Sequence, residues 1–137
     1  MPPETIRQGR QVASDVGPIV PDDSPALLHE VFERTALRYP REVAIEVPPG
    51  TGRPARVRLT YSEALERVHA LAARLAPHVP GECVVAIALP RDSAAIYIAQ
   101  LAVMESGAAY TCLATGLPPD RERYLIEDCR AAAVIAR

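Results

Sequence analysis

Phosphate binding is the first chemistry to consider, because glycine-rich loops and lysines are its usual agents in proteins. All 15 basic residues of the chain are arginines, so a G-x-x-x-x-G-K-[ST] loop is excluded. The only G-x-G sequence is Gly50-Thr51-Gly52, which lies between prolines and precedes no predicted helix. A dinucleotide-binding loop requires a strand before it and a helix after it. We therefore interpret these glycines as part of a turn.

Histidine and cysteine, the common transition-metal ligands, are few and scattered. No H-x-x-H or H-E-x-x-H spacing links the three histidines, which are His29, His69 and His78. No C-x-x-C pair occurs among the three cysteines, which are Cys83, Cys112 and Cys129. We favour half-packed or solvated histidines, and small buried cysteines in a reducing cytosol. The sequence thus predicts neither a metal site nor a disulfide framework.

Neither the serines nor the paired carboxylates lie in a recognisable catalytic motif. No serine lies in a G-x-S-x-G sequence. Capping accounts for the three serines that begin predicted helices, which are Ser24, Ser62 and Ser93. Of two carboxylate pairs, Asp22-Asp23 precedes the first predicted helix and Glu127-Asp128 lies near the end of the last. General acid–base catalysis needs groups that converge on a pocket. We assign no catalytic, cofactor-binding or metal-binding residue to this chain.

The composition is that of an ordinary globular domain. The chain has 137 residues, of which 49% are hydrophobic and 23% charged, and its formal net charge is −2. This balance favours neither a nucleic-acid nor a membrane partner. Residues 1–20 lack the apolar core of a signal peptide, and the longest apolar stretch, residues 94–104, is too short to span a bilayer. We expect a cytoplasmic protein.

The first half of the chain predicts a leader, a helix and a hairpin. Residues 1–23 are rich in proline and polar residues without a regular period, which is typical of a flexible leader. Ser24-Pro25 suit the N-cap and first position of a helix, which Tyr39-Pro40 end. The alternating residues 42–47 and 55–60 flank a turn rich in proline and glycine, and they predict a β-hairpin.

A capping box marks the start of the second helix. Thr60 is followed three residues later by Glu63, a spacing at which each side chain bonds the other residue's backbone N–H. Apolar residues then recur at helical spacing as far as Leu75. Pro77 and Pro80-Gly81 end the helix.

The second half of the chain predicts a parallel sheet. Residues 83–89 form a continuous apolar run, which suits a strand buried on both faces. Alternating helices and strands follow, over residues 92–106, 108–113, 119–130 and 131–136. This βαβαβ order indicates an α/β fold in which helices flank a parallel sheet. Gly107 follows the first of these helices, at the C′ position where a left-handed conformation is expected.

Four segments resemble the opening motifs of amino-acid adenylation domains. Residues 59–65 read Leu-Thr-Tyr-Ser-Glu-Ala-Leu and resemble the first core motif. Residues 104–110 read Met-Glu-Ser-Gly-Ala-Ala-Tyr and resemble the start of the second, Leu-Lys-Ala-Gly-x-Ala-Tyr. Residues 118–128 are similar to the Pro-x-x-Arg and Leu-x-Asp pattern that follows, and residues 28–33 to the opening helix. Residues 24–137 are thus similar to the front of an adenylation domain of the nonribosomal peptide synthetase type.

This resemblance implies a larger adenylate-forming fold, of which residues 24–137 would be a partial, amino-terminal subdomain. It also implies a reaction in which an amino acid and ATP give an aminoacyl adenylate and pyrophosphate, with Mg²⁺ assisting. Transfer to a carrier-protein thiol would follow. The partners implied are the carrier protein and the remainder of the adenylation domain or synthetase. The family's phosphate loop follows the strand that matches residues 131–136, and its catalytic lysine lies farther on, so ATP and Mg²⁺ are expected for the full-length domain only.

Two departures from the family pattern stand out. Residues 111–115 read Thr-Cys-Leu-Ala-Thr where the second motif continues Leu-Pro-Leu/Ile-Asp-Pro, and the loop is less constrained because proline fixes φ. Cys129-Arg130 replace the usual Ser-Gly at a helix end, where arginine is poorly suited to a left-handed conformation. Two alternatives account for these changes, which are subfamily variation or drift in a sequence no longer selected for catalysis.

Two hypotheses follow from the sequence. The first is an amino-terminal fragment of an ATP-dependent amino-acid-activating ligase, inactive alone. The second is a free-standing, non-catalytic interaction module derived from such a domain, which docks on a synthetase through an open sheet edge. Under the first hypothesis we expect the isolated chain to self-associate or to stay partly folded, because residues 83–89 and 131–136 need cover on both faces.

Overall fold

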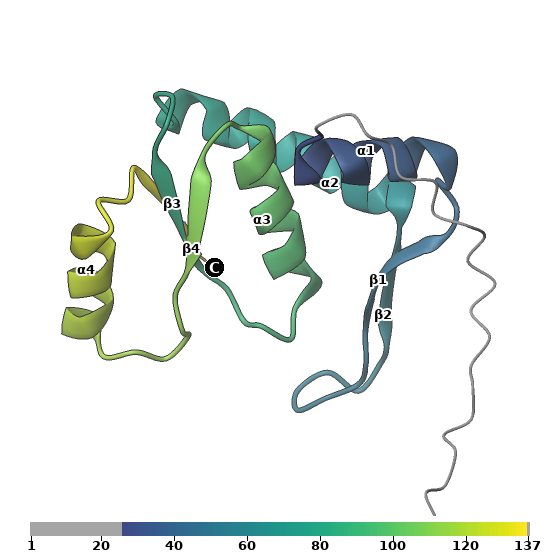
Figure 1. Cartoon of the computed structure of the whole chain (residues 1–137). Coiled ribbons are helices and arrows are strands. Elements are labelled where there is room, and N and C mark those ends of the chain that lie inside the picture. The colour runs from purple at the N-terminus through teal and green to yellow at the C-terminus, as the bar shows by residue number, and fades with distance from the viewer. Residues whose placement is uncertain (1–25, 137) are drawn as a thin grey trace, which may run out of the picture.

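The computed structural model describes residues 26–136, so the predicted leader over residues 1–23 and the N-cap predicted at Ser24 lie outside the described residues. The described part follows the predicted order of helices and strands, with a short 3₁₀ helix, η1, added after the second α-helix. The elements are α1 (Leu28–Arg38), β1 (Val43–Val47), β2 (Val57–Thr60), α2 (Tyr61–Leu75), η1 (Ala76–His78), β3 (Val84–Ala88), α3 (Ala94–Glu105), β4 (Ala109–Cys112), α4 (Pro119–Asp128) and β5 (Ala133–Ala136). In Figure 1, α3 stands between the β1–β2 hairpin and the parallel sheet.

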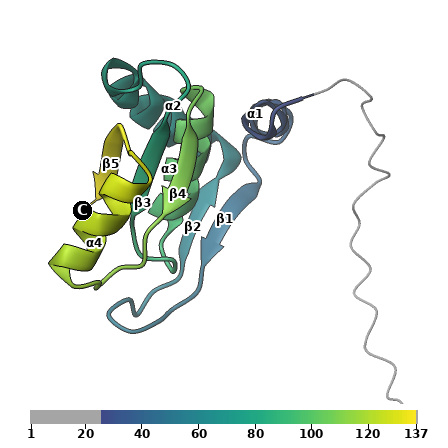
Figure 2. The ribbon, with the colours of Figure 1, turned by 60° about the vertical axis from the view of Figure 1, so that its left-hand side comes forward.

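The parallel sheet has the strand order β4-β3-β5, with β3 in the centre. Val85 of β3 lies opposite Tyr110 on β4 and Ala133 on β5. The chain moves to one side of β3 through α3 and to the other side through α4. Because parallel crossovers are right-handed, these opposite moves place α3 and α4 on opposite faces of the sheet, as Figure 2 shows. The predicted βαβαβ unit is confirmed.

The β1–β2 hairpin is antiparallel and closes at the predicted turn. Val47 pairs with Val57, and a further bridge joins Gly50 to Arg53 at the tip. On the exposed face, Glu46 of β1 bonds Arg58 and Arg56. The hydrogen bond from Arg58, with the charges of both arginines, lowers the pKa of Glu46 below its usual value. The cross-strand ion pairs thus reinforce the pairing of Glu46 with Arg58 in the predicted hairpin.

The predicted capping box of α2 is confirmed. The backbone N–H of Glu63 donates to Thr60 Oγ1 over 3.3 Å, and the backbone N–H of Thr60 donates to Glu63 Oε2 over 2.8 Å. The Thr60 backbone N–H and the Thr60 hydroxyl both donate to the Glu63 carboxylate, favour its ionised form and lower the pKa of Glu63. The cap therefore fixes where β2 ends and α2 begins.

The predicted start of α1 and the predicted cap at Ser62 need correction. Helix α1 begins at Leu28, three residues after the predicted first position Pro25, and its N-cap is Leu27, whose backbone N–H donates to Glu30 Oε2 over 2.9 Å. A carboxylate in the first turn accepts a hydrogen bond from one of the otherwise unpaired N–H groups there. Ser62 does not cap α2, because Thr60 does. Ser93 caps α3 as predicted and accepts from the backbone N–H of Ala95 over 3.1 Å.

The core lies between the parallel sheet, α2 and α3. Its members are almost all small or branched aliphatic side chains, which include Ala64, Val68, Ala72, Val85, Ile87, Ala99, Ala102 and Val103. Alanines on both α2 and α3 let the two helix backbones approach closely. Within residues 26–136, none of the helices has the length and apolar character needed to traverse a bilayer.

The central and edge strands differ in burial. Val85, Ala86 and Ile87 of β3 are all fully buried, so the prediction of cover on both faces is confirmed there. Cover of β5 is incomplete in this chain, because half-buried and exposed residues alternate along it and Val134 is 43% exposed. Helix α4 contributes no buried residue, so it covers β5 incompletely.

Candidate functional site

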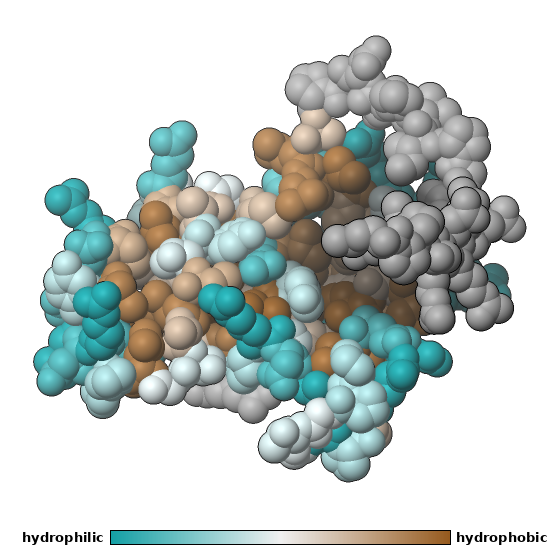
Figure 3. Space-filling model, turned by 60° about the horizontal axis from the view of Figure 1, so that its bottom comes forward, coloured by the Kyte–Doolittle hydropathy of each residue, from teal (hydrophilic) through white to brown (hydrophobic). Residues whose placement is uncertain are grey.

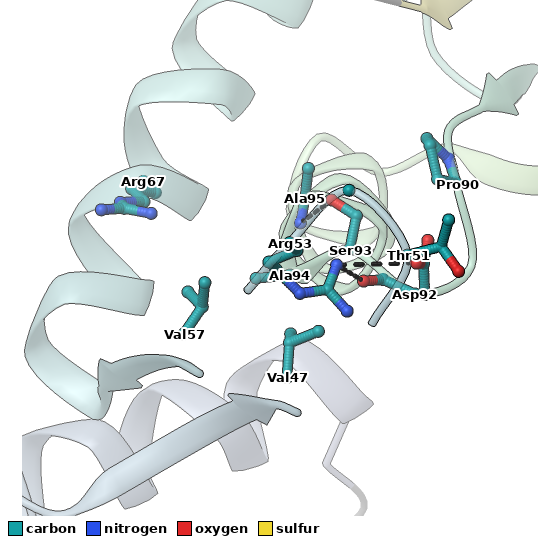
Figure 4. Close-up of a pocket in the computed structure, with 11 residues that line it drawn as sticks. Val47, Thr51, Arg53, Val57, Arg67, Pro90, Asp92, Ser93, Ala94 and Ala95 are labelled. Atoms are coloured by element: carbon teal, nitrogen blue, oxygen red, sulfur yellow. Dashed lines mark hydrogen bonds and ion pairs between the residues drawn. The ribbon is translucent and has the colours of Figure 1, made fainter. Parts of the chain in front are cut away.

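A cavity of about 580 Å³ lies where the hairpin tip meets the carboxyl end of β3. Its walls come from the hairpin, from α2 and from the loop that joins β3 to α3 (Figure 4). The lining residues with polar or charged side chains are Thr51, Arg53, Arg67, Asp92 and Ser93. Ligands in parallel α/β sheets bind at the carboxyl ends of strands, which makes this cavity the first place to look for function.

Arg53 holds the hairpin tip against the β3–α3 loop. Its Nε and Nη2 atoms donate to the carbonyl oxygen of Pro48 over 3.1 and 2.8 Å. Its Nη1 atom donates to the carbonyl oxygen of Asp92 over 2.8 Å and lies 3.5 Å from Asp92 Oδ2. Figure 4 shows the guanidinium facing Asp92, with Arg67 across the cavity on α2. One side chain thus joins two segments 39 residues apart in the sequence.

The cavity offers binding groups rather than catalytic ones. Its one carboxylate, Asp92, is paired with Arg53, and the hydroxyl of Ser93 serves as a helix cap. Its lining includes no histidine or cysteine. A general base must be within hydrogen-bond reach of the proton that it abstracts. The arrangement therefore suits positioning of the loop after β3. This role was not predicted from the sequence, because a single arginine in a turn belongs to no recognisable motif.

Removing the Arg53 side chain is expected to loosen this junction. Arg53→Ala leaves two backbone carbonyls without their charged donor, and we expect a loss of about 1–2 kcal/mol in the free energy of unfolding. Urea denaturation of both proteins measures the change. The control Arg91→Ala alters an exposed residue of the same loop and should change stability by less than about 0.5 kcal/mol. Equal midpoints for the two variants would show that Arg53 does not join the two segments.

The histidines, the cysteines and the Glu127-Asp128 pair remain apart, and the Asp22-Asp23 pair lies outside the described residues. His69 Nε2 lies 3.9 Å from Glu33 Oε1 and 3.8 Å from Glu105 Oε2 on a half-exposed helix surface. His29 and His78 lie on other elements, and both members of the Glu127-Asp128 pair are exposed. The cysteines Cys83, Cys112 and Cys129 are free and half-buried at three separate places. Within residues 26–136, no three histidine, cysteine or acidic side chains are grouped so that they could hold a metal ion.

The strand order indicates a second candidate binding position at the same edge of the sheet. After β3 the chain turns toward α3 on one face, whereas β5 is reached through α4 on the other face. The strand order therefore reverses at β3, and open α/β sheets form a binding crevice at the carboxyl ends of strands where such a reversal occurs. The loop over residues 89–93 borders this crevice on the β3 side.

Known proteins resemble this chain over most of its length. Residues 32–137 match the family described as AMP-binding enzyme. N-(5-amino-5-carboxypentanoyl)-L-cysteinyl-D-valine synthase of Penicillium rubens is 37% identical over 110 residues, which cover 80% of this chain and 3% of the synthase. Enterobactin synthase component F of Escherichia coli O157:H7 is 38% identical over 109 residues, which cover 77% of this chain and 8% of that protein.

The solved structures show the same fold. The N-terminal subdomain of NpsA from Klebsiella oxytoca has a TM-score of 0.65 and 27% sequence identity, over 80% of this chain and 27% of the subdomain. NpsA is also solved within NpsA-ThdA, an artificially fused adenylation–PCP di-domain. The chain spans only a small part of the two synthases and about a quarter of the NpsA subdomain. These similarities agree with the fold and the amino-terminal position that the motifs predicted.

Proposed function

We propose that this chain, which belongs to the AMP-binding enzyme family, supplies the amino-terminal part of an adenylation domain of the nonribosomal peptide synthetase type. In the proposed reaction, the carboxylate of an amino acid attacks the α-phosphorus of ATP, and pyrophosphate leaves. The thiol of a carrier protein then takes the aminoacyl group and releases AMP. The chain by itself is proposed to be inactive, with the carrier and the remainder of the domain as its partners.

The continuous family match over residues 32–137 is the observation that carries this proposal. The motifs within it have structural roles. Residues 59–65 contain the capping box of α2, and residues 104–110 contain Gly107, which ends α3 with a φ of 79°. Both motifs fix the ends of helices that pack against β3. The matched residues therefore build a scaffold for the switch-point crevice rather than the reacting groups.

The switch point supports a specific place for the nucleotide phosphates. The resemblance puts the family's phosphate loop immediately after the strand that corresponds to β5. The carboxyl end of β5 lies at the crevice that parallel sheets use for nucleotides. A loop leaving β5 would therefore enter that crevice beside residues 89–93. Backbone N–H groups of such a loop would suit phosphate oxygens.

The residues of this chain do not fit an ATP·Mg²⁺ site on their own. Its basic residues are all arginine, and within residues 26–136 no cluster of three acidic or histidine side chains is available to a metal. We therefore assign the phosphate and Mg²⁺ contacts to the remainder of the domain, where the bound metal would offset phosphate charge. The three free cysteines fit the cytoplasmic location that we also propose.

A pair of exchange assays tests this function. The chain alone is expected to give no amino-acid-dependent exchange between pyrophosphate and ATP. A chimera in which residues 32–136 replace the corresponding part of NpsA should show exchange with the acid that NpsA activates, because the scaffold is conserved in shape. The measurement is label transfer from pyrophosphate to ATP.

Deletion of the same part from NpsA provides the control and should abolish exchange. Exchange by the chain alone would contradict the assignment of the reacting groups to the remainder. A chimera that folds with a cooperative melt yet catalyses no exchange would contradict the scaffold role. That result would favour the interaction module as the chain's function.

A further inference from the structure

The Gly50-Thr51-Gly52 turn at the hairpin tip fixes the backbone from which Arg53 projects. Gly50 and Arg53 exchange two backbone hydrogen bonds, each over 2.9 Å. Gly52 lies in the left-handed region with a φ of 74°, which a glycine adopts without strain. The tip is thus closed by its own backbone, and the Arg53 side chain starts from a fixed point.

The loop after β3, residues 89–93, is held at its two ends by the fold around it. Leu89 at its start is buried and belongs to the core. Ser93 at its end caps α3. Between these two anchors, Arg91 and Asp92 are exposed and add nothing to the core. The middle of the loop therefore depends on a contact from outside the loop to hold its position.

The Arg53 guanidinium supplies that contact, and it bridges two backbones rather than two side chains. It donates to the carbonyl oxygen of Pro48 in the hairpin and to that of Asp92 in the loop. Its distance to the Asp92 carboxylate is longer, at 3.5 Å, and that side chain is 67% exposed. Exposed ion pairs contribute little, so the two carbonyl contacts dominate. A lysine would keep the charge but lacks the planar fork that reaches both carbonyls.

The bridged loop lies at the end of the sheet where parallel α/β folds bind their ligands. Residues 89–93 follow β3, at whose carboxyl end the strand order reverses. Figure 1 shows the hairpin tip and this loop together at the lower end of the ribbon. Figure 3 brings that end toward the viewer and shows hydrophilic surface projecting there. A shift of residues 90–92 would therefore move both the rim of the crevice and the start of α3.

We propose that Arg53 is a positioning residue for adenylate formation. It holds residues 90–92 at the rim of the crevice, so that ATP bound there meets a fixed backbone. This inference rests on the proposed function. A group that borders a substrate must keep its place closely, because small misplacements cost binding and rate. The hairpin thereby contributes to the reaction through the loop that it holds, although it supplies none of the reacting groups.

Exchange kinetics of the NpsA chimera, measured over a range of ATP and acid concentrations, test this role. In Arg53→Ala we expect the KM for ATP to rise at least roughly fivefold, and the KM for the acid to change by less than about twofold. Partial unfolding of the variant would lower kcat but leave both KM values unchanged, because the folded molecules keep their affinities. The KM for ATP therefore separates positioning of the loop from loss of stability.

Two further variants of the same chimera sharpen the test. Arg53→Lys keeps the positive charge without the planar fork, so it should raise the KM for ATP as Arg53→Ala does. It also replaces Arg53→Ala in the comparison if that variant does not fold. Arg58→Ala is the matched control, because it removes an arginine from the same hairpin that bonds Glu46 on the exposed face. This control should leave both KM values unchanged.

Parental KM values in Arg53→Ala would overturn the inference, whether or not kcat falls. A parental KM for ATP in Arg53→Lys would show that the charge suffices without the bridge, and would also overturn it. An equal rise of this KM in Arg58→Ala would assign the effect to the whole hairpin, against a specific role of Arg53. A folded parent chimera without exchange would instead contradict the proposed function, and the inference with it, so the two failures are distinguishable.

Discussion

Replacing Ile87 by alanine is expected to lower the free energy of unfolding by about 2–5 kcal/mol. Ile87 is 0% exposed, lies in the central strand β3 and belongs to the cluster shared with α2 and α3. Truncation removes apolar contact area and leaves a cavity, since its neighbours on β4 and β5 are held by the sheet hydrogen bonds. This position should therefore be among the most sensitive in the chain.

Urea denaturation followed by circular dichroism measures the effect. Val134→Ala on β5 is the matched control, because it removes a branched side chain from the same sheet at a position that is 43% exposed. We expect the control to cost less than about 1 kcal/mol. If Ile87→Ala and Val134→Ala shifted the midpoint equally, β3 would not be the centre of the core. A non-cooperative transition in the parent chain would instead support the predicted self-association or partial folding.

Gly107→Val is expected to destabilise the chain by about 1–3 kcal/mol. Gly107 has a φ of 79° and ends α3 in a Schellman motif. In that motif its N–H donates to the carbonyl of Met104, and the N–H of Ala108 donates to the carbonyl of Val103. A Cβ added at Gly107 would meet no atom within 4 Å. The cost therefore comes from the left-handed backbone, which a β-branched residue strongly disfavours.

The end of helix α4 allows the reverse substitution, in which glycine replaces a non-glycine residue at the equivalent C′ position. Arg130 has a φ of 50°, and the N–H groups of Arg130 and Ala131 bond the carbonyls of Glu127 and Ile126 in the same motif. Arg130→Gly relieves about 1–2 kcal/mol of backbone strain and loses about 0.5–1 kcal/mol through the greater freedom of unfolded glycine. A net gain of about 0.5–1 kcal/mol is expected.

The two variants are compared by denaturation of the same parent. Opposite signs for Gly107→Val and Arg130→Gly would confirm that the two helices end in the same left-handed conformation. A gain for Gly107→Val, or a loss for Arg130→Gly, would contradict the assigned backbone geometry. The arginine noted in the sequence as a departure from the family pattern thus has a measurable physical cost.

The sequence by itself determined the features that depend on near neighbours. The Thr60–Glu63 capping box, the left-handed Gly107 and the Ser93 cap each involve residues at most a few positions apart, so the local sequence specifies them. The apolar run of β3 predicted its burial, and the order of helices and strands predicted the parallel sheet. The motifs made the family recognisable from the sequence because they specify these local helix and strand ends.

The tertiary structure decided the features that depend on distant residues. Strand order, the exposed face of β5 and the cavity at the hairpin tip follow from how whole elements pack, and periodicity carries no information on which element covers which. Arg53 acquires its role only when folding brings the hairpin tip to Asp92. Helix α1 begins at Leu28 rather than at Pro25, and the Glu30 side chain reaches back to the backbone N–H of Leu27 there. Packing and side-chain reach in three dimensions, rather than local propensity, determine such contacts.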